Sequence, residues 1–69
     1  MIKLSARNQL KGKIVAVQKG TVTAHVRIEL SGGATVTSSI TNEAVEELAL
    51  KVGDEAWAVI KASDVMIGK

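Results

Sequence analysis

The stretch Thr21-Val22-Thr23-Ala24-His25-Val26-Arg27-Ile28-Glu29-Leu30 decides the fold, because its side chains alternate strictly between two classes. Even-numbered positions carry Val, Ala, Val, Ile and Leu, whereas odd-numbered positions carry Thr, Thr, His, Arg and Glu. Successive side chains of a β-strand point to opposite faces, so this pattern predicts a strand with one buried and one solvated face. We therefore build the fold outward from this strand.

Two further strands are expected beside it. Residues 12–19 contain the apolar run Ile14-Val15-Ala16-Val17, which favours a strand covered on both faces. A turn at residues 18–21 would join it to residues 21–30 as a hairpin, with Gly20 free to adopt a positive φ. Glycine-containing residues 31–34 then turn the chain into a third strand at 35–40.

The pattern changes from strand to helix at Thr41. Residues 41–48 lose the alternation and place Ala44, Val45 and Leu48 on one helical face. Thr41 or Asn42 can cap the first turn. We therefore predict a helix of about two turns, which packing must hold because so short a helix is marginal alone.

The remaining elements complete a barrel-like order. A turn at 52–54 leads to a strand at 55–61, and a final short strand is expected at Val65 to Ile67. Five short strands, with one short helix between the third and the fourth, match a small OB-like Greek-key barrel. The predicted fold class is thus mainly β, in one domain spanning residues 1–69.

Composition indicates that the chain needs partner subunits. At 69 residues the core is small, and such domains usually rely on disulfides, metals or oligomerisation. Cysteine is absent, His25 is the only histidine, and Trp57 is the only aromatic residue among 46% hydrophobic residues. We expect some of the abundant aliphatic side chains to face another subunit.

Targeting signals are not expected. The opening residues do not read as a signal peptide, and no apolar run approaches the length of a membrane span, so we expect a cytoplasmic protein without a membrane partner. The net charge is only +2. Residues 1–28 nevertheless carry six Lys or Arg and no acid, whereas residues 29–69 carry three Lys and seven acids. This asymmetry could orient subunits against each other.

One polar stretch near the start of the chain favours an anion. The stretch Ser5-Ala6-Arg7-Asn8-Gln9-Leu10-Lys11-Gly12 carries a hydroxyl, a guanidinium and a carboxamide within its first four residues, with Lys3 and Lys13 on either side. Donors and positive charge without local counter-charge suit an anionic ligand. The alternative is an ordinary polar loop before a strand.

The same stretch resembles the opening motif of the molbindins, the small molybdate-binding Mop proteins. The resemblance continues in 50–55, Leu-Lys-Val-Gly-Asp-Glu, and in 59–67, Val-Ile-Lys-Ala-Ser-Asp-Val-Met-Ile. Related Mop (TOBE-like) domains occur in molybdate-responsive regulators and in transporter ATPase subunits. The resemblance implies one Mop domain folded as a small barrel, a dimer that exchanges segments, and a hexamer built from such dimers.

Three groups of donors could converge on a tetrahedral dianion. They are Ser5 with Arg7, the helix start at Thr41, and the strand end Lys61-Ala62-Ser63. Molybdate is such a dianion at neutral pH, and tungstate is its analogue. Phosphate is partly protonated there and needs an acceptor, while sulfate is smaller. A site built only from donors can therefore discriminate by charge state and size.

The resemblance implies residue roles at these positions. It places the oxyanion between subunits, held by Ser5, Arg7, Lys61 and Ala62, with Thr41 contributing as in some relatives. Certain Mop domains have a serine where this chain has Ala44, which leaves only a backbone N–H there, and Ser63 is the candidate substitute. A second class of anion site near a symmetry axis is implied, for which Lys19, Gly20 and Thr21 are the candidates.

From their positions in the sequence, Arg7 and Lys61 are expected to act as partners across a subunit boundary. They lie on different elements, and neither has an obvious acidic partner within its own motif, although Asp64 lies three residues after Lys61. Simpler interpretations stay open: Thr41 as a cap, Lys61 as a solvated lysine, and Arg7 paired with Glu46 of a neighbour.

Other functions are weighed against this one. There is no G-x-S-x-G nucleophile context, so we predict no enzyme activity, and a solvated His25 leaves no metal cation site. The rival is an OB-like nucleic-acid-binding module, which a single Trp57 and the acidic residues 43–55 disfavour. A third possibility is a purely structural oligomerisation module. We predict a molybdate-binding protein for intracellular molybdenum storage and homeostasis, without a DNA-binding or ATPase domain in these 69 residues.

Overall fold

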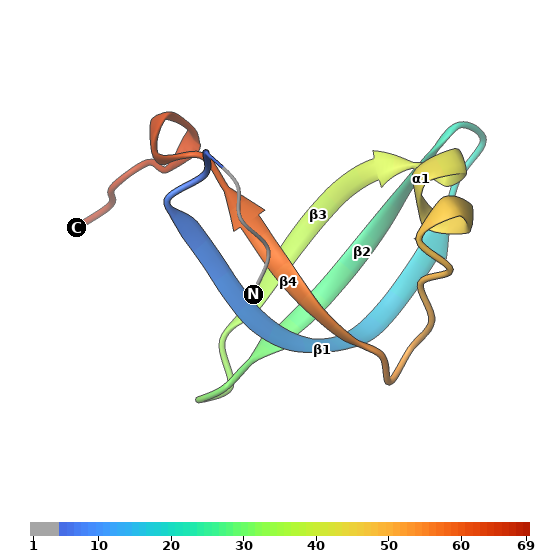
Figure 1. The fold of residues 1–69 in the computed structure, drawn as a ribbon, viewed down its shortest axis with the longest axis horizontal. Helices are drawn as coiled ribbons and strands as arrows, with labels where there is room; N and C mark the ends of the chain where they lie inside the picture. Colours follow the sequence, from blue (N-terminus) through green and yellow to red (C-terminus); the bar gives the residue numbers. More distant parts are fainter. Residues whose placement is uncertain (1–4) are drawn as a thin grey trace.

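The described part of the chain, residues 5–69, forms four strands, one α-helix and one 3₁₀ helix (Figure 1). The computed structural model describes residues 5–69, so Lys3 lies outside the described residues. In chain order the elements are β1 (Asn8–Lys19), β2 (Thr23–Leu30), β3 (Thr35–Thr41), α1 (Asn42–Glu47), β4 (Glu55–Ile60) and η1 (Ala62–Asp64).

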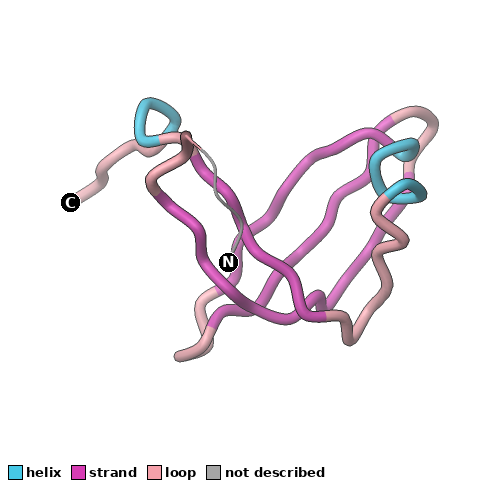
Figure 2. Tube along the Cα trace, in the orientation of Figure 1, coloured by secondary structure: helices cyan, strands magenta, loops and turns pink. Residues whose placement is uncertain are grey.

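The strands form one antiparallel sheet in the order β3-β2-β1-β4. Three consecutive strands lie side by side and the fourth returns beside the first, which is the Greek-key order. The sheet curls into a trough, and α1 lies at one end of it (Figures 1 and 2). A register shift in β1 between Ile14 and Ala16 contributes to the curl, because a bulge bends its strand and increases the local twist.

The sheet confirms the predicted hairpin, the third strand and the strand before Lys61. One expectation is wrong. Residues 65–67 form no strand, because no described strand lies beside them to pair with, and Met66 and Ile67 are 92% and 90% exposed. The Greek-key order of the predicted barrel is present as a curled sheet of four strands, which is open within one chain because β3 and β4 are its two edges. The polar residues from Asn8 onward belong to β1 and are not a loop before it.

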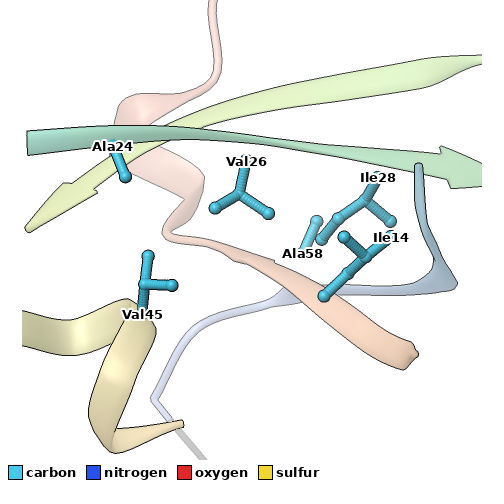
Figure 3. Packing of buried hydrophobic residues seen from close by; sticks show 6 residues of the cluster. All are labelled: Ile14, Ala24, Val26, Ile28, Val45 and Ala58. Carbon is cyan, nitrogen blue, oxygen red and sulfur yellow. The ribbon is translucent and has the colours of Figure 1, made fainter. Parts of the chain in front are cut away.

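The core is small and aliphatic. The concave face of the sheet contributes Ile14, Ala24, Val26, Ile28 and Ala58, and Val45 of α1 covers its Ala24 end (Figure 3). The alternation that predicted β2 is confirmed, because its even-numbered side chains are the ones that become buried. The α1 helix is thus anchored to the sheet by a single buried side chain.

Gly12 lets β1 run across the middle of the sheet without a break. A Cβ atom at this position would lie 2.5 Å from the Glu29 carbonyl oxygen and 2.6 Å from Cγ2 of Ile28. No side chain fits into that space, so only glycine allows β1 and β2 to approach so closely. The continuous β1 strand joins the two ends of the molecule.

The start of α1 is capped by Thr41. Its Oγ1 accepts a hydrogen bond from the Ala44 N–H at 3.0 Å, and Glu43 places a carboxylate in the first turn, where the helix dipole favours negative charge. The cap explains how the chain passes from β3 into a helix of only six residues. It also confirms the interpretation of Thr41 as a capping residue.

The end of α1 closes through two backbone hydrogen bonds. Ala49 N–H donates to the Glu46 carbonyl at 3.1 Å, and Leu50 N–H donates to the Val45 carbonyl at 3.1 Å. This is the Schellman arrangement, and it requires a left-handed residue after the helix. Ala49 occupies that position with φ 51°, where glycine is the usual residue.

Candidate anion-binding site

The pairing of β1 with β4 brings two of the predicted cations to one end of the sheet. Asn8 and Ile60 form the last pair of this ladder. Arg7 immediately precedes that pair and Lys61 immediately follows it, so the backbones of both cations leave the sheet together. We define the cationic end as the exposed residues Ser5, Arg7, Lys61, Ala62 and Ser63.

The cationic end has charge and donors without internal partners. The ion pairs found among residues 5–69 are Lys11–Glu55 and Lys19–Glu46, each at 3.3 Å, so within that range neither Arg7 nor Lys61 has a carboxylate partner. Lys61 precedes η1 in an extended conformation. The first N–H groups of a helix have no acceptor within it, so Ala62 and Ser63 can offer backbone N–H groups there.

The opposite end of the sheet holds the remaining predicted residues. Thr41 ends β3 beside Thr23, where β2 begins. The Asn42 side chain donates to the Gly20 carbonyl at 2.9 Å, which ties the β1–β2 turn to α1. We define the helix end as Lys19, Gly20, Thr21, Thr41 and α1.

The polar groups of the helix end are largely engaged within the chain. Lys19 pairs with Glu46, the residue considered as a partner for Arg7 of a neighbour. A polar hollow of about 260 Å³ adjoins this end, lined by Gln18, Lys19, Gly20, Thr23 and His25. The candidate second anion site therefore lies beside Thr41, and its lysine already has a counter-charge.

The two ends lie far apart within one chain. They occupy opposite sides of the molecule in Figure 1, joined by the length of β1, and the longest dimension of the molecule is 33 Å. One small tetrahedral anion cannot contact both ends of the same chain. A site that combines Thr41 with Arg7 and Lys61 therefore requires two chains, whereas Arg7 and Lys61 need no subunit boundary to come together.

The structure does not support the donor role that was expected for the Ala44 N–H in anion binding. Its backbone N–H was expected to be available to an anion, but it donates to Thr41 Oγ1. The cap occupies this N–H because Ala44 lies three residues after the capping residue, in the usual position for such a bond. The hydroxyl hydrogen of Thr41 remains as the donor at this position.

Two buried amide oxygens lack partners, one near each end. Oε1 of Gln9, next to Asn8, and Oδ1 of Asn42 have no hydrogen-bond partner among residues 5–69. Buried polar atoms are normally satisfied, so ordered water or donors from outside the described residues are expected to bond to these oxygens. The sequence analysis did not identify these two amide oxygens as atoms in need of a partner. The only signal was the adjacent amide pair Asn8-Gln9 in the polar stretch, to which we assigned no role.

Cation-binding and membrane features are not found. Residues 5–69 contain no group of three or more His, Asp or Glu side chains suited to a metal ion. Within the same described range, no helix has the length and apolarity needed to cross a bilayer.

Comparison with known proteins gives consistent matches over nearly the whole chain. The sequence profile of the TOBE domain family matches residues 4–67. The chain is 59% identical to molybdenum-pterin-binding protein 3 of Clostridium pasteurianum, covering 93% of this chain and 94% of that one. It is 52% identical to a probable molybdenum-pterin-binding protein of Haemophilus influenzae, covering 97% of both.

Solved structures show the same fold. MopII of Clostridium pasteurianum superposes with a TM-score of 0.91 at 54% identity, covering 97% of this chain and 100% of that one. A molybdate-binding protein of Sporomusa ovata gives a TM-score of 0.92 at 32% identity, covering 99% and 100%. The cytoplasmic molybdate-binding protein ModG, with molybdate bound, gives 0.90 at 51% identity, covering 94% of this chain and 46% of ModG.

Proposed function

This chain belongs to the TOBE domain family, and we propose that it binds molybdate, with tungstate as an analogue, through its cationic end. The observation that carries the proposal is that Arg7 and Lys61 leave the sheet together without a carboxylate partner among residues 5–69. The relatives named as molybdenum-pterin-binding or molybdate-binding proteins match more than nine-tenths of this chain, which supports the proposal.

The chemistry of the cationic end suits a fully deprotonated dianion. Two positive charges balance two negative charges, and the Ser5 and Ser63 hydroxyls with the N–H of Ala62 supply further donors. A protonated phosphate would also need an acceptor, which in this group could come only from a serine hydroxyl and not from a carboxylate. Sulfate would fit the charge but is smaller.

We place the complete site between subunits. Thr41 from a second chain would add a hydroxyl donor to the cationic end of the first, since one chain keeps these groups apart. The two buried amide oxygens that lack a partner among residues 5–69, one near each end, are available to donors of a neighbouring chain or of water. For the second class of site, an anion at Lys19, Gly20 and Thr21 would have to compete with Glu46 for the lysine.

A segment-exchanged dimer and a hexamer of such dimers fit the surface of the chain. Val65, Met66 and Ile67 extend away from the body and are exposed. An apolar groove of about 330 Å³ lies open on the concave side of the sheet, lined mainly by Ile14, Val26, Ile28, Ile40, Leu48 and Leu50. The free edges of β3 and β4 could also pair with a second chain. Residues 65–67 of one chain filling the groove of another would stabilise both.

The physiological role we propose is intracellular storage and homeostasis of molybdenum by a non-enzymatic, cytoplasmic protein with a single Mop domain over residues 1–69. ModG, a cytoplasmic molybdate-binding protein, supports the location. The nucleic-acid alternative lacks support in the site, because Trp57 is the only aromatic residue. Its ring already faces the Lys11 ammonium, whose Nζ lies 5.8 Å from the ring centroid in a cation–π contact.

Calorimetric titration with molybdate, sulfate and phosphate tests the function. We expect tight binding of molybdate and much weaker binding of the other two, and a flat molybdate trace from assembled protein would refute the proposal. Trp57 fluorescence should respond to molybdate and should not change with single-stranded DNA.

Light scattering tests the oligomeric state, for which we expect a mass near six chains. A folded monomer at micromolar concentration would contradict this assembly.

A further inference from the structure

The side chain of Asn8 ties β1 to β4 at the cationic end. Its Nδ2 donates a hydrogen bond to the carbonyl oxygen of Ile60 at 3.1 Å, in a half-buried position. The two residues are 52 positions apart in sequence and form the last pair of the ladder. This bond therefore closes the ladder at the point where Arg7 and Lys61 begin.

Such a bond controls the positions of both neighbouring cations. The last pairs of a ladder open most easily, because little packing holds them on the outer side. Without the Asn8 amide, the Ile60 carbonyl would lose this side-chain partner, and the backbone of Lys61 and Ala62 would gain freedom. Arg7 is bonded covalently to Asn8, and Lys61 to Ile60, so the bond limits the separation of the backbones from which the two cationic side chains extend.

We propose that Asn8 is a positioning residue for the anion. It holds the backbones of Arg7 and Lys61 at the separation that suits molybdate, and it does so without contacting the ion. Preorganised donors bind more tightly because less freedom is lost on binding. A fixed spacing also discriminates by size, so the same bond supports selection of molybdate over the smaller sulfate. This inference rests on the proposed function.

Two substitutions test the proposal by calorimetry. Asn8→Leu keeps a similar volume but cannot donate, and Asn8→Ala removes the side chain. Outer partners that orient metal ligands typically contribute 10–100-fold in affinity. We expect each variant to bind molybdate about 10-fold more weakly, at the lower end of that range, and to lose part of the preference for molybdate over sulfate.

A matched control separates positioning from general loss of stability. Asp54→Ala removes another side-chain bond to the backbone, from the Lys51 N–H to Asp54 Oδ2 at 3.0 Å, in the turn before β4. This bond lies at the end of β4 away from Lys61. We expect Asp54→Ala to bind molybdate with unchanged affinity and unchanged selectivity.

A double substitution shows whether Asn8 acts through Lys61. Asn8→Leu should cost much less affinity in a Lys61→Ala background than in the wild type, because the ammonium it positions is already absent. Full additivity of the two losses would overturn the proposal, as would wild-type affinity and selectivity in Asn8→Leu. A flat wild-type titration would instead refute the proposed function, so the two failures are distinguishable.

If both Asn8 variants fail to assemble, hydrogen exchange measured on the wild-type protein tests the proposal instead. The side-chain amide protons of Asn8 should exchange with solvent more slowly than those of an exposed asparagine, and more slowly again after molybdate is added. Exchange at the exposed rate in both states would contradict the proposal. Slow exchange that does not change with molybdate would make the bond purely structural and would also overturn it.

Discussion

The two ends of the sheet contrast in how their polar groups are satisfied. At the helix end, Thr41 caps α1, Lys19 pairs with Glu46, and the Asn42 amide holds the Gly20 carbonyl. At the cationic end, one bond from Asn8 to Ile60 closes the ladder, and within residues 5–69 no carboxylate pairs with Arg7 or Lys61.

This contrast separates stability from binding. Groups that are satisfied within the chain contribute to folding, so their removal should lower the free energy of unfolding. Groups held apart from any counter-charge contribute little to folding and are available to a ligand. Substitutions at the two ends should therefore affect different measurements.

The largest effect is expected at the cationic end. Arg7→Ala and Lys61→Ala each leave charge on the anion uncompensated, and truncating one side of such a pair typically costs about 2–5 kcal/mol. This corresponds to roughly 30-fold to several thousand-fold in molybdate affinity by calorimetry. The assembly should survive, because without the anion the two cations repel each other.

Two cations elsewhere serve as controls for this prediction. Arg27→Ala on β2 and Lys51→Ala before β4 remove the same residue types away from both candidate sites, and both should bind like the wild type. Undiminished affinity in Arg7→Ala or Lys61→Ala would remove that residue from the site.

Gly12→Ala tests the strand that joins the two ends. The new methyl group would overlap the Glu29 carbonyl and the Ile28 side chain, and overpacking of this kind costs about 1–3 kcal/mol. We expect a lower midpoint in urea denaturation. Gly68→Ala is the matched control, because a Cβ there meets nothing within 4 Å. Equal stability of the two variants would show that β1 and β2 are not this close.

Thr41→Ala should lower stability at the helix end. Loss of a capping residue costs about 1 kcal/mol, within a range of roughly 0.5–2. Thr41→Ser keeps an oxygen acceptor for Ala44 N–H and should retain most of the stability, measured by thermal unfolding. Affinity for molybdate should fall in Thr41→Ala and not in Thr41→Ser, since the proposed site uses the hydroxyl. An Ala variant as stable as the Ser variant would contradict the capping role.

The smallest expected effect is an increase in the free energy of unfolding, at the C-terminal end of α1. Ala49 has φ 51°, a conformation that glycine adopts without the steric cost of a Cβ atom. Ala49→Gly should therefore raise the free energy of unfolding by about 0.5–1 kcal/mol, as for other glycines placed at compatible positions after a helix. Ala49→Val should lower it, and a decrease in the glycine variant would show that the left-handed conformation is not maintained.

The sequence predicted most of the fold because periodicity reports burial locally. The alternation in residues 21–30 became β2, and the change of pattern at Thr41 became α1. The polar residues Asn8 to Lys11 were not recognised as strand, since pairing with β4 rather than propensity places them in the sheet. The fifth strand at 65–67 failed for the opposite reason, because it has strand-like residues but no partner in the described chain.

The candidate site was predictable in its residues but not in its arrangement. Donor side chains, together with the family resemblance, singled out Arg7 and Lys61 from the sequence. Their meeting within one chain depends on the antiparallel register that pairs Asn8 with Ile60, and the distance to Thr41 depends on the path of β1. Neither follows from spacing along the chain.

The central claim is that one chain supplies Arg7 and Lys61 to a molybdate ion while another supplies Thr41. The most direct test is molybdate titration of mixed assemblies, refolded together from two variant chains, with exchange verified by mass spectrometry. Lys61→Ala mixed with Thr41→Ala should regain some tight sites, because an intact cationic end of one chain can meet an intact Thr41 of the other. Arg7→Ala mixed with Lys61→Ala should regain none, since every cationic end then lacks one cation. Recovery in the second mixture, or none in the first, would contradict this arrangement.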